Sequence, residues 1–191
     1  MKIRSLFCVL ILITAFAAAA EAQSTRSYSD AKHGFSVSYP GNFKVRTGKS
    51  AATETAFGEP GRGVKLAKFS PRSIPAKHHG EYEFNVWRSN AKAAKCGVPI
   101  ADESNAIPIE APATAKTRTI AGHKFYAYTG SEGGMSKSLG VNGYRGMAGG
   151  KCWQIQSMTY QVSAFDDFKP FNQKPIDRAF DKFVRSFKFK N

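Results

Sequence analysis

The sequence predicts an α+β protein with a mostly antiparallel central sheet and a C-terminal amphipathic helix. Three observations predict it. Several short segments alternate between apolar and polar residues, glycine-containing turns join neighbouring segments, and one apolar stripe with helical spacing ends the chain. Because tight turns connect antiparallel neighbours, these segments are expected to form one antiparallel sheet that helices cover.

Residues 34–39 contain the clearest strand pattern, since their apolar and aromatic side chains alternate with serines. Proline and glycine at residues 40–41 end that strand with a turn. Residues 43–46 resume the alternation in a second short strand, and residues 47–63 are expected to form a loop. Residues 64–69 are expected to form a further strand, which ends there because the prolines that follow cannot continue it.

Residues 81–87 predict a strand with two distinct faces. Tyr82, Phe84 and Val86 are expected to point inward, and Glu81, Glu83 and Asn85 outward. Residues 89–95 have a helix-forming composition with Ser89 placed to cap the first turn. Residues 102–116 are rich in proline and alanine and are expected to be a connection.

The second half of the chain predicts a hairpin and a helix. Residues 123–128 are expected to form a strand, and residues 136–147 and 151–160 flank a glycine turn. Glycines within the first arm indicate bulges or close backbone contacts. The final helix begins near Pro175. Its apolar stripe consists of Ile176, Phe180, Phe183, Val184 and Phe187.

The first 22 residues have the layout of a secretory signal peptide. Lys2 and Arg4 precede an uncharged apolar run at residues 6–20, and small residues flank an expected cut before Gln23, with a cut before Glu21 as the alternative. The run is shorter than the ~20 apolar residues of a membrane-spanning helix. We therefore expect no transmembrane segment and a periplasmic or secreted protein after cleavage.

The mature chain, residues 23–191, has the length of one domain and shows no internal repeat or low-complexity linker. Cys8 lies in the middle of the apolar run rather than at its end, so no lipid anchor is expected.

Two cysteines remain after cleavage, Cys96 and Cys152, with a sequence separation of 56. An even count in an exported chain favours a disulfide between them. The alternative is a reactive thiol with a histidine base, but no Cys-x-x-Cys motif supports it.

The formal net charge is +14. Such an excess attracts anionic surfaces, so an envelope protein or an anionic surface is the expected partner. An exported chain seldom meets nucleic acid, and none is expected as a partner. The basic residues are scattered singly, so a solvated basic surface is the alternative explanation.

His79, Glu81 and Glu83 are the best metal candidates, because alternate positions of an extended strand share one face. Imidazole and carboxylate groups suit zinc or manganese. The alternative, which the spacing favours, is a polar strand entrance that faces solvent, and neither a metal nor a cofactor is expected.

Aromatic residues with nearby cations indicate a second candidate, a ligand-binding sheet face. The alternative is ordinary strand composition. The candidates are Tyr126, Tyr128, Tyr144, Trp153 and Tyr160. The sequence contains no Gly-x-Ser-x-Gly elbow, phosphate loop or dinucleotide fingerprint, so no catalytic residue is assigned.

Two ends of the chain resemble the PsbP-like domain family. Residues 28–30 and 34–40, followed by Phe43 to Val45, are similar to the start of that domain, and residues 180–189 are similar to its closing helix and Ser-Phe-Lys-Phe end. Gly122 with Phe125 is similar to its central strand. The resemblance implies an α/β/α sandwich and a binding or assembly activity.

Together these observations predict an exported, non-enzymatic binding or accessory protein of the bacterial envelope. The alternative is an envelope hydrolase with an unrecognised carboxylate and histidine site. Many bacterial PsbP-like proteins begin with a lipid-modified cysteine, and this chain is expected not to.

Overall fold

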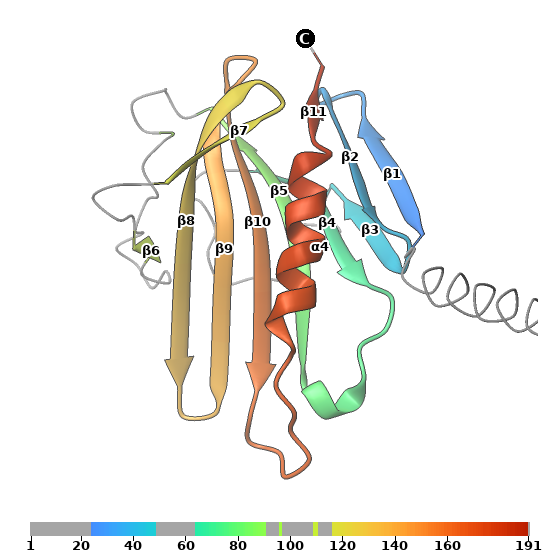
Figure 1. Ribbon diagram of the computed structural model, residues 1–191, viewed down its shortest axis with the longest axis vertical. Coiled ribbons are helices and arrows are strands. Elements are labelled where there is room, and N and C mark those ends of the chain that lie inside the picture. Colours follow the sequence, from blue (N-terminus) through green and yellow to red (C-terminus); the bar gives the residue numbers. More distant parts are fainter. Residues whose placement is uncertain (1–23, 49–63, 91–95, 97–108, 111–115, 191) are drawn as a thin grey trace, which may run out of the picture.

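The computed structural model describes residues 24–48, 64–90, 96, 109–110 and 116–190. The predicted signal peptide therefore lies outside the described residues. So do most of the predicted helix at 89–95 and most of the connection at 102–116. Within the described residues the strands form two antiparallel sheets beside one long helix (Figure 1).

The larger sheet contains the predicted hairpin at its centre. Its neighbouring strands are all antiparallel, and β7 (Thr117–Ile120) also pairs with β8. Their order across the sheet is β3 (Phe43–Thr47), β4 (Val64–Pro71), β5 (Gly80–Ser89), β10 (Lys151–Val162), β9 (Lys137–Ala148), β8 (His123–Gly134) and β6 (Ile109–Glu110). The predicted α+β class and mostly antiparallel sheet are confirmed.

The smaller sheet joins the two ends of the described chain. Its order is β1 (Thr25–Asp30), β2 (Phe35–Pro40) and β11 (Lys188–Phe189). Phe189 pairs with Phe35 in register, and the Lys190 N–H donates to the Gly34 carbonyl at 2.8 Å. The chain therefore closes on itself through backbone hydrogen bonds that the sequence pattern does not indicate.

Helix α4 (Gln173–Arg185) confirms the predicted C-terminal helix. The Asn172 side chain caps it by accepting a hydrogen bond from the Lys174 N–H. Its apolar stripe is buried and packs against the larger sheet and β2, forming the main core (Figure 1). The core members from α4 are Ile176, Phe180, Phe183 and Val184.

The opposite face of the larger sheet is also buried, which the sequence did not indicate. Glu83 and Asn85 of β5 were expected to point outward, yet both are 0% exposed. Glu83 makes an ion pair with Lys68 and accepts a hydrogen bond from the Asn85 amide at 2.8 Å. The alternation was predicted correctly, but the expectation that these residues face solvent is wrong. A period of two identifies residues that share a face and does not reveal whether that face is covered.

The predicted disulfide lies on this second face. Cys152 at the start of β10 bonds to Cys96 with an S–S distance of 2.09 Å and a Cα–Cα distance of 5.5 Å. A small apolar cluster fills the same face further along β8, β9 and β10. It consists of Tyr128, Leu139, Val141 and Met158. No helix among the described residues is long and apolar enough to cross a membrane.

Candidate ligand-binding cleft

The five aromatic residues predicted to form one ligand surface are divided between the two faces of the larger sheet. Strand register puts Tyr126 opposite Arg145 and puts Trp153 opposite Gly146, and neighbouring positions of a strand face opposite ways. Tyr126, Tyr128 and Tyr160 therefore share the second face, with Tyr128 only 2% exposed. The predicted common surface is not formed.

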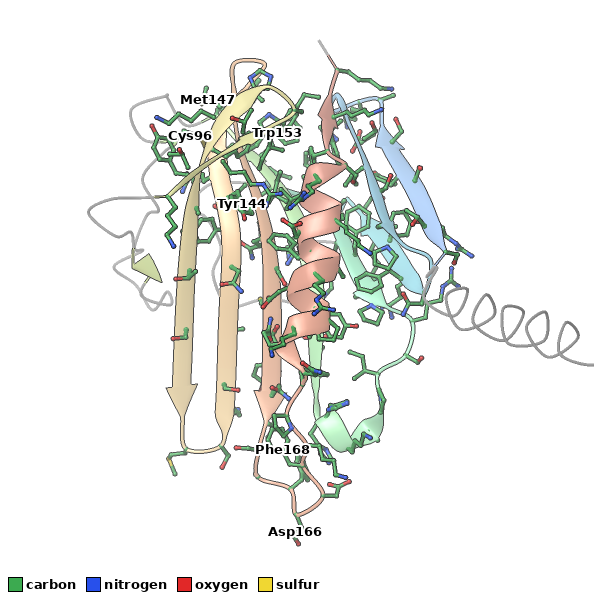
Figure 2. All side chains as sticks on the ribbon, viewed as in Figure 1. Cys96, Tyr144, Met147, Trp153, Asp166 and Phe168 are labelled. Carbon is green, nitrogen blue, oxygen red and sulfur yellow. A yellow bond between two sulfur atoms is a disulfide. The ribbon has the colours of Figure 1, made fainter. Side chains whose placement is uncertain are left out.

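Tyr144 and Trp153 belong instead to the core beside α4, in the upper half of the sheet (Figure 2). Trp153 packs edge-on against Phe35, with ring centroids 5.6 Å apart. Tyr144 stacks on Phe180 of α4 at 6.2 Å. These two aromatic residues hold the helix and the smaller sheet in place.

The three metal candidates are not brought together either. His79 lies in the turn before β5 with a left-handed φ of 40°, and its Nε2 is 2.6 Å from the Asp167 carboxylate. Glu81 is exposed, whereas Glu83 is committed to its buried ion pair. Among the described residues no three His, Cys, Asp or Glu side chains gather in a way that suits a metal ion.

A cleft of about 380 Å³ lies on the α4 face, beside the first turn of the helix. In Figure 1 no helix covers the lower parts of β8 and β9, and the cleft is built on those parts together with β10. Its volume is in the range of small-molecule sites. It is lined by Thr129, Gly130, Ser131, Gly140, Val141, Asn142, Ser157, Thr159 and Gln173.

The cleft exists because three strands change composition at the same level. Along the α4 face, β8 changes from Phe125 to Thr129 and Ser131, and β10 changes from Trp153 and Ile155 to Ser157 and Thr159. On β9 the same face changes from Tyr144 to Asn142 and Gly140. The large side chains pack under the helix, and the small polar ones leave a hollow beyond its end.

Ser157 lies deepest among the hydroxyl groups of the cleft. It is 2% exposed, and its Oγ has no hydrogen-bond partner among the described residues. A buried hydroxyl without a partner is destabilising by about 1–3 kcal/mol, and such groups are uncommon in folded proteins. Five described residues have a buried side-chain polar atom of this kind, and Ser157 is the one among them that lines the cleft.

Gly140 opens the cleft from the side of β9. A Cβ built on it meets nothing within 4 Å, and its φ is not in the positive range. The position can accept a side chain without strain, and a larger residue there would fill part of the cleft. This gives a means of closing the cleft by substitution.

The described lining is uncharged. It offers hydroxyl groups, side-chain amides and the backbone groups of Gly130, Gly140 and Val141. Such groups bind and orient a ligand through hydrogen bonds. General acid–base chemistry needs a titratable group within reach of the substrate, and the described lining includes no such group.

Sequence reasoning missed the cleft. A signal was present: small polar residues recur at alternate positions of three neighbouring segments. Only the strand register shows that these positions lie at one level, so the pattern becomes a site only after the strands are paired.

Comparisons with known proteins identify the fold. No protein-family model matches this sequence, and no curated protein matches it. The chain is similar to the solved structure of LpqN of Mycobacterium tuberculosis, a protein involved in cell envelope biogenesis. The identity is 10%, the match covers 88% of this chain and 91% of LpqN, and the TM-score is 0.51.

Two further solved structures are similar. Cyanobacterial PsbP from Synechocystis is 15% identical over 90% of this chain and 95% of that protein, with a TM-score of 0.45. A Bacteroides thetaiotaomicron protein is 6% identical over 87% of this chain, with a TM-score of 0.47. This chain spans about half of the Bacteroides protein, 48%.

These identities establish the fold alone. The likeness to LpqN shows that the two chains share it. A solved PsbP structure is among the similar ones.

Proposed function

We propose that this protein is an exported accessory protein of the bacterial envelope that acts by binding a small polar ligand in the β8–β9–β10 cleft. The observation that carries the proposal is the buried, unpartnered Ser157 hydroxyl at the base of a cleft lined by hydrogen-bonding groups. The mature chain, residues 23–191, acts as one domain in this proposal.

Three observations support the envelope as the place of action. The first 22 residues have the layout of a signal peptide. The Cys96–Cys152 disulfide suits an oxidising compartment. LpqN, which shares the fold, is involved in cell envelope biogenesis. Each is compatible with a protein that folds after export.

The positions of the titratable groups favour a binding function over the hydrolase alternative. A serine nucleophile needs an adjacent base, and the described lining around Ser157 includes no histidine or carboxylate. The histidine–carboxylate pairs lie elsewhere: His79 contacts Asp167 at 2.6 Å, and His33 contacts Asp30 at 2.8 Å. Neither pair includes a residue of the cleft.

The proposal is tested by filling the cleft. Gly140→Leu places a side chain in the open space, and Gly134→Leu is the matched control, because a Cβ there also meets nothing within 4 Å and Gly134 is not part of the lining. Each purified protein is incubated with a small-molecule extract of the envelope and examined by native mass spectrometry.

The unsubstituted protein and Gly134→Leu are expected to retain a small molecule that Gly140→Leu does not. Circular dichroism checks that all three are folded. Equal retention by the two variants would contradict a ligand-binding function for this cleft.

Export is tested separately. Expression of the full chain in a bacterium should give a mature protein in the periplasm or medium that begins at Gln23, or at Glu21 for the alternative cut. Mass spectrometry of the intact protein measures this. A cytoplasmic protein that retains residues 1–22 would contradict the export part of the proposal.

A further inference from the structure

We propose that the ligand of the cleft is a neutral polyhydroxyl compound of saccharide type. This rests on the proposed function, and it adds the chemical class that the cleft selects. Three features favour such a ligand: the hydrogen-bonding groups of the lining, its lack of charged side chains, and the few free donors at the nearby helix terminus.

The lining groups both donate and accept hydrogen bonds. Hydroxyls come from Thr129, Ser131, Ser157 and Thr159, and side-chain amides come from Asn142 and Gln173. The Gln173 Nε2 already donates to the Asp177 carboxylate at 2.9 Å, which leaves its oxygen as the acceptor. A hydroxyl or an amide can serve in either role. The ligand that satisfies most of these groups at once carries several groups of the same dual character, which is the property of a polyol.

Charge argues against an ionised ligand. The described residues of the lining include no Lys, Arg, His, Asp or Glu. An ion that left water for this cleft would lose its solvation without gaining a charged partner. The overall net charge of +14 would attract anions to the surface in general, but no described lining residue supplies a positive charge.

The helix terminus beside the cleft is poorly suited to an anion. Anion sites at helix N-termini use free backbone N–H groups. In α4 the Lys174 N–H is already bound to the Asn172 side chain, and Pro175 has no N–H. The first turn therefore offers fewer donors than an ordinary helix terminus.

An apolar occupant is disfavoured for the opposite reason. It would cover the exposed hydroxyls of Thr129 and Ser131 without giving them partners, and buried polar groups without partners are destabilising. A neutral ligand with hydroxyl groups avoids both penalties. The volume of about 380 Å³ leaves room for a ligand of one sugar ring or more.

The test uses defined probes on the full mature protein. Methyl α-glucoside, N-acetylglucosamine and myo-inositol represent neutral polyols, inorganic phosphate and acetate represent anions, and indole represents apolar ligands. Backbone amide shifts of Gly130, Gly140 and Asn142 are followed by NMR during titration. We expect saturable shifts at these positions with at least one polyol and none with phosphate, acetate or indole.

Two variants make the result specific. Ser157→Ala should weaken the affinity for the polyol that binds by about 5–10-fold, the equivalent of one lost hydrogen bond. Ser27→Ala is the control, because Ser27 is exposed in β1 of the other sheet. Gly140→Leu should abolish the shifts, and Gly134→Leu should preserve them.

Failure of the two proposals is distinguishable. If a ligand is retained from the envelope extract through the cleft but no polyol binds, the saccharide class is wrong and the binding function stands. Saturable shifts with phosphate or acetate alone would also overturn the polyol assignment. If the extract yields no cleft ligand and no probe binds, the binding function itself is wrong.

Discussion

At the residue scale, two glycines of β9 have opposite reasons for lacking a side chain. At Gly143 a Cβ would overlap the ring of Tyr128, which crosses the strand there. That ring is 2% exposed, and its hydroxyl donates to the Gln156 side chain at 3.1 Å. Burial raises the pKa of Tyr128 well above its usual value, so it stays neutral. At Gly140 the same position is open. The close backbone contact predicted for the glycines of β9 is found at Gly146, where a Cβ would meet the Lys124 carbonyl.

Gly143→Ala should therefore destabilise the protein. The added methyl group forces the buried ring of Tyr128 to move, and overpacking of this kind is destabilising by about 1–3 kcal/mol. Urea unfolding measures the change in free energy. Gly140→Ala is the matched control, and it should leave stability unchanged or slightly raised. Equal destabilisation by both substitutions would show that ring contact is not the reason for glycine at Gly143.

At the scale of elements, α4 is held by its apolar stripe and by one ionic cluster. The Asp181 carboxylate accepts from Arg118 and from Arg185, each at 2.7 Å. Arg118 also donates to the Tyr144 hydroxyl at 3.1 Å and so links the helix to β7 and β9. Burial pushes the pKa of Asp181 upward, but the hydrogen bonds and charges of the two arginines outweigh it and leave the pKa below its usual value.

This cluster predicts a specific pH dependence of stability. Because the folded pKa of Asp181 is depressed, its contribution is fully present above the unfolded value of about 3.9. It is lost as pH falls through the folded value. Asp181→Asn should reduce unfolding free energy by up to about 1 kcal/mol at neutral pH, as expected for a partly exposed pair. The difference from the unsubstituted protein should shrink as pH falls below 4.

Asp30 provides a second case for comparison. Burial raises its pKa, but the hydrogen bonds from His33 and Tyr28 and the charge of His33 outweigh it and lower the net value. Asp30→Asn should therefore lower the free energy of unfolding in the same pH window as Asp181→Asn. The losses from the two substitutions should add, because the two sites share no partner. Urea unfolding at a series of pH values measures both. A difference in unfolding free energy between variant and unsubstituted protein that grows toward low pH would contradict the lowered pKa of that aspartate.

At the scale of the whole molecule, the two faces of the larger sheet carry different features. One face carries α4, the main core and, at its far end, the cleft. The other carries the buried ion pair of Glu83 and the disulfide. The disulfide and the cleft lie on opposite faces, so covalent stabilisation and ligand binding are separable.

Replacing both Cys96 and Cys152 with alanine should lower stability and leave the cleft intact. The bond closes a loop of 56 residues, and the loss expected for a native bond is about 2–4 kcal/mol. Thermal unfolding with and without reductant measures it. The envelope-extract experiment should still show retention by this double variant. Loss of retention in a folded variant would mean that the two faces are coupled.

The net charge makes a second prediction at this scale. If the basic excess binds an anionic surface, association with anionic vesicles should fall steeply as salt rises, because the screening length is ~8 Å at physiological ionic strength. Vesicle co-sedimentation at increasing salt measures it, with neutral vesicles as the control. Absence of binding at low salt would show that the charge of +14 is a solvated surface.

Local patterns were enough to predict much of the fold. Alternation over residues 34–39 predicted β2, and the glycine turn at residues 148–150 predicted the β9–β10 hairpin. The stripe from Ile176 to Phe187 predicted α4, although Phe187 lies beyond the end of the helix at Arg185. Each depends on neighbours within one element or one turn. The disulfide could be predicted from the sequence for a different reason, because the two remaining cysteines allow only one pairing.

Long-range pairing decided the rest. The contact of Phe189 with Phe35, the burial of Glu83 and the separation of Tyr144 from Tyr128 all depend on which strands become neighbours and on what covers each face. The cleft belongs to the same class, since Ser131, Asn142 and Ser157 lie far apart in the chain. The sequence by itself determined β2 to β5, β8 to β10 and α4, because periodicity is a local property. Only the tertiary structure determined the site, because register aligns the small polar positions of three strands beside the end of one helix.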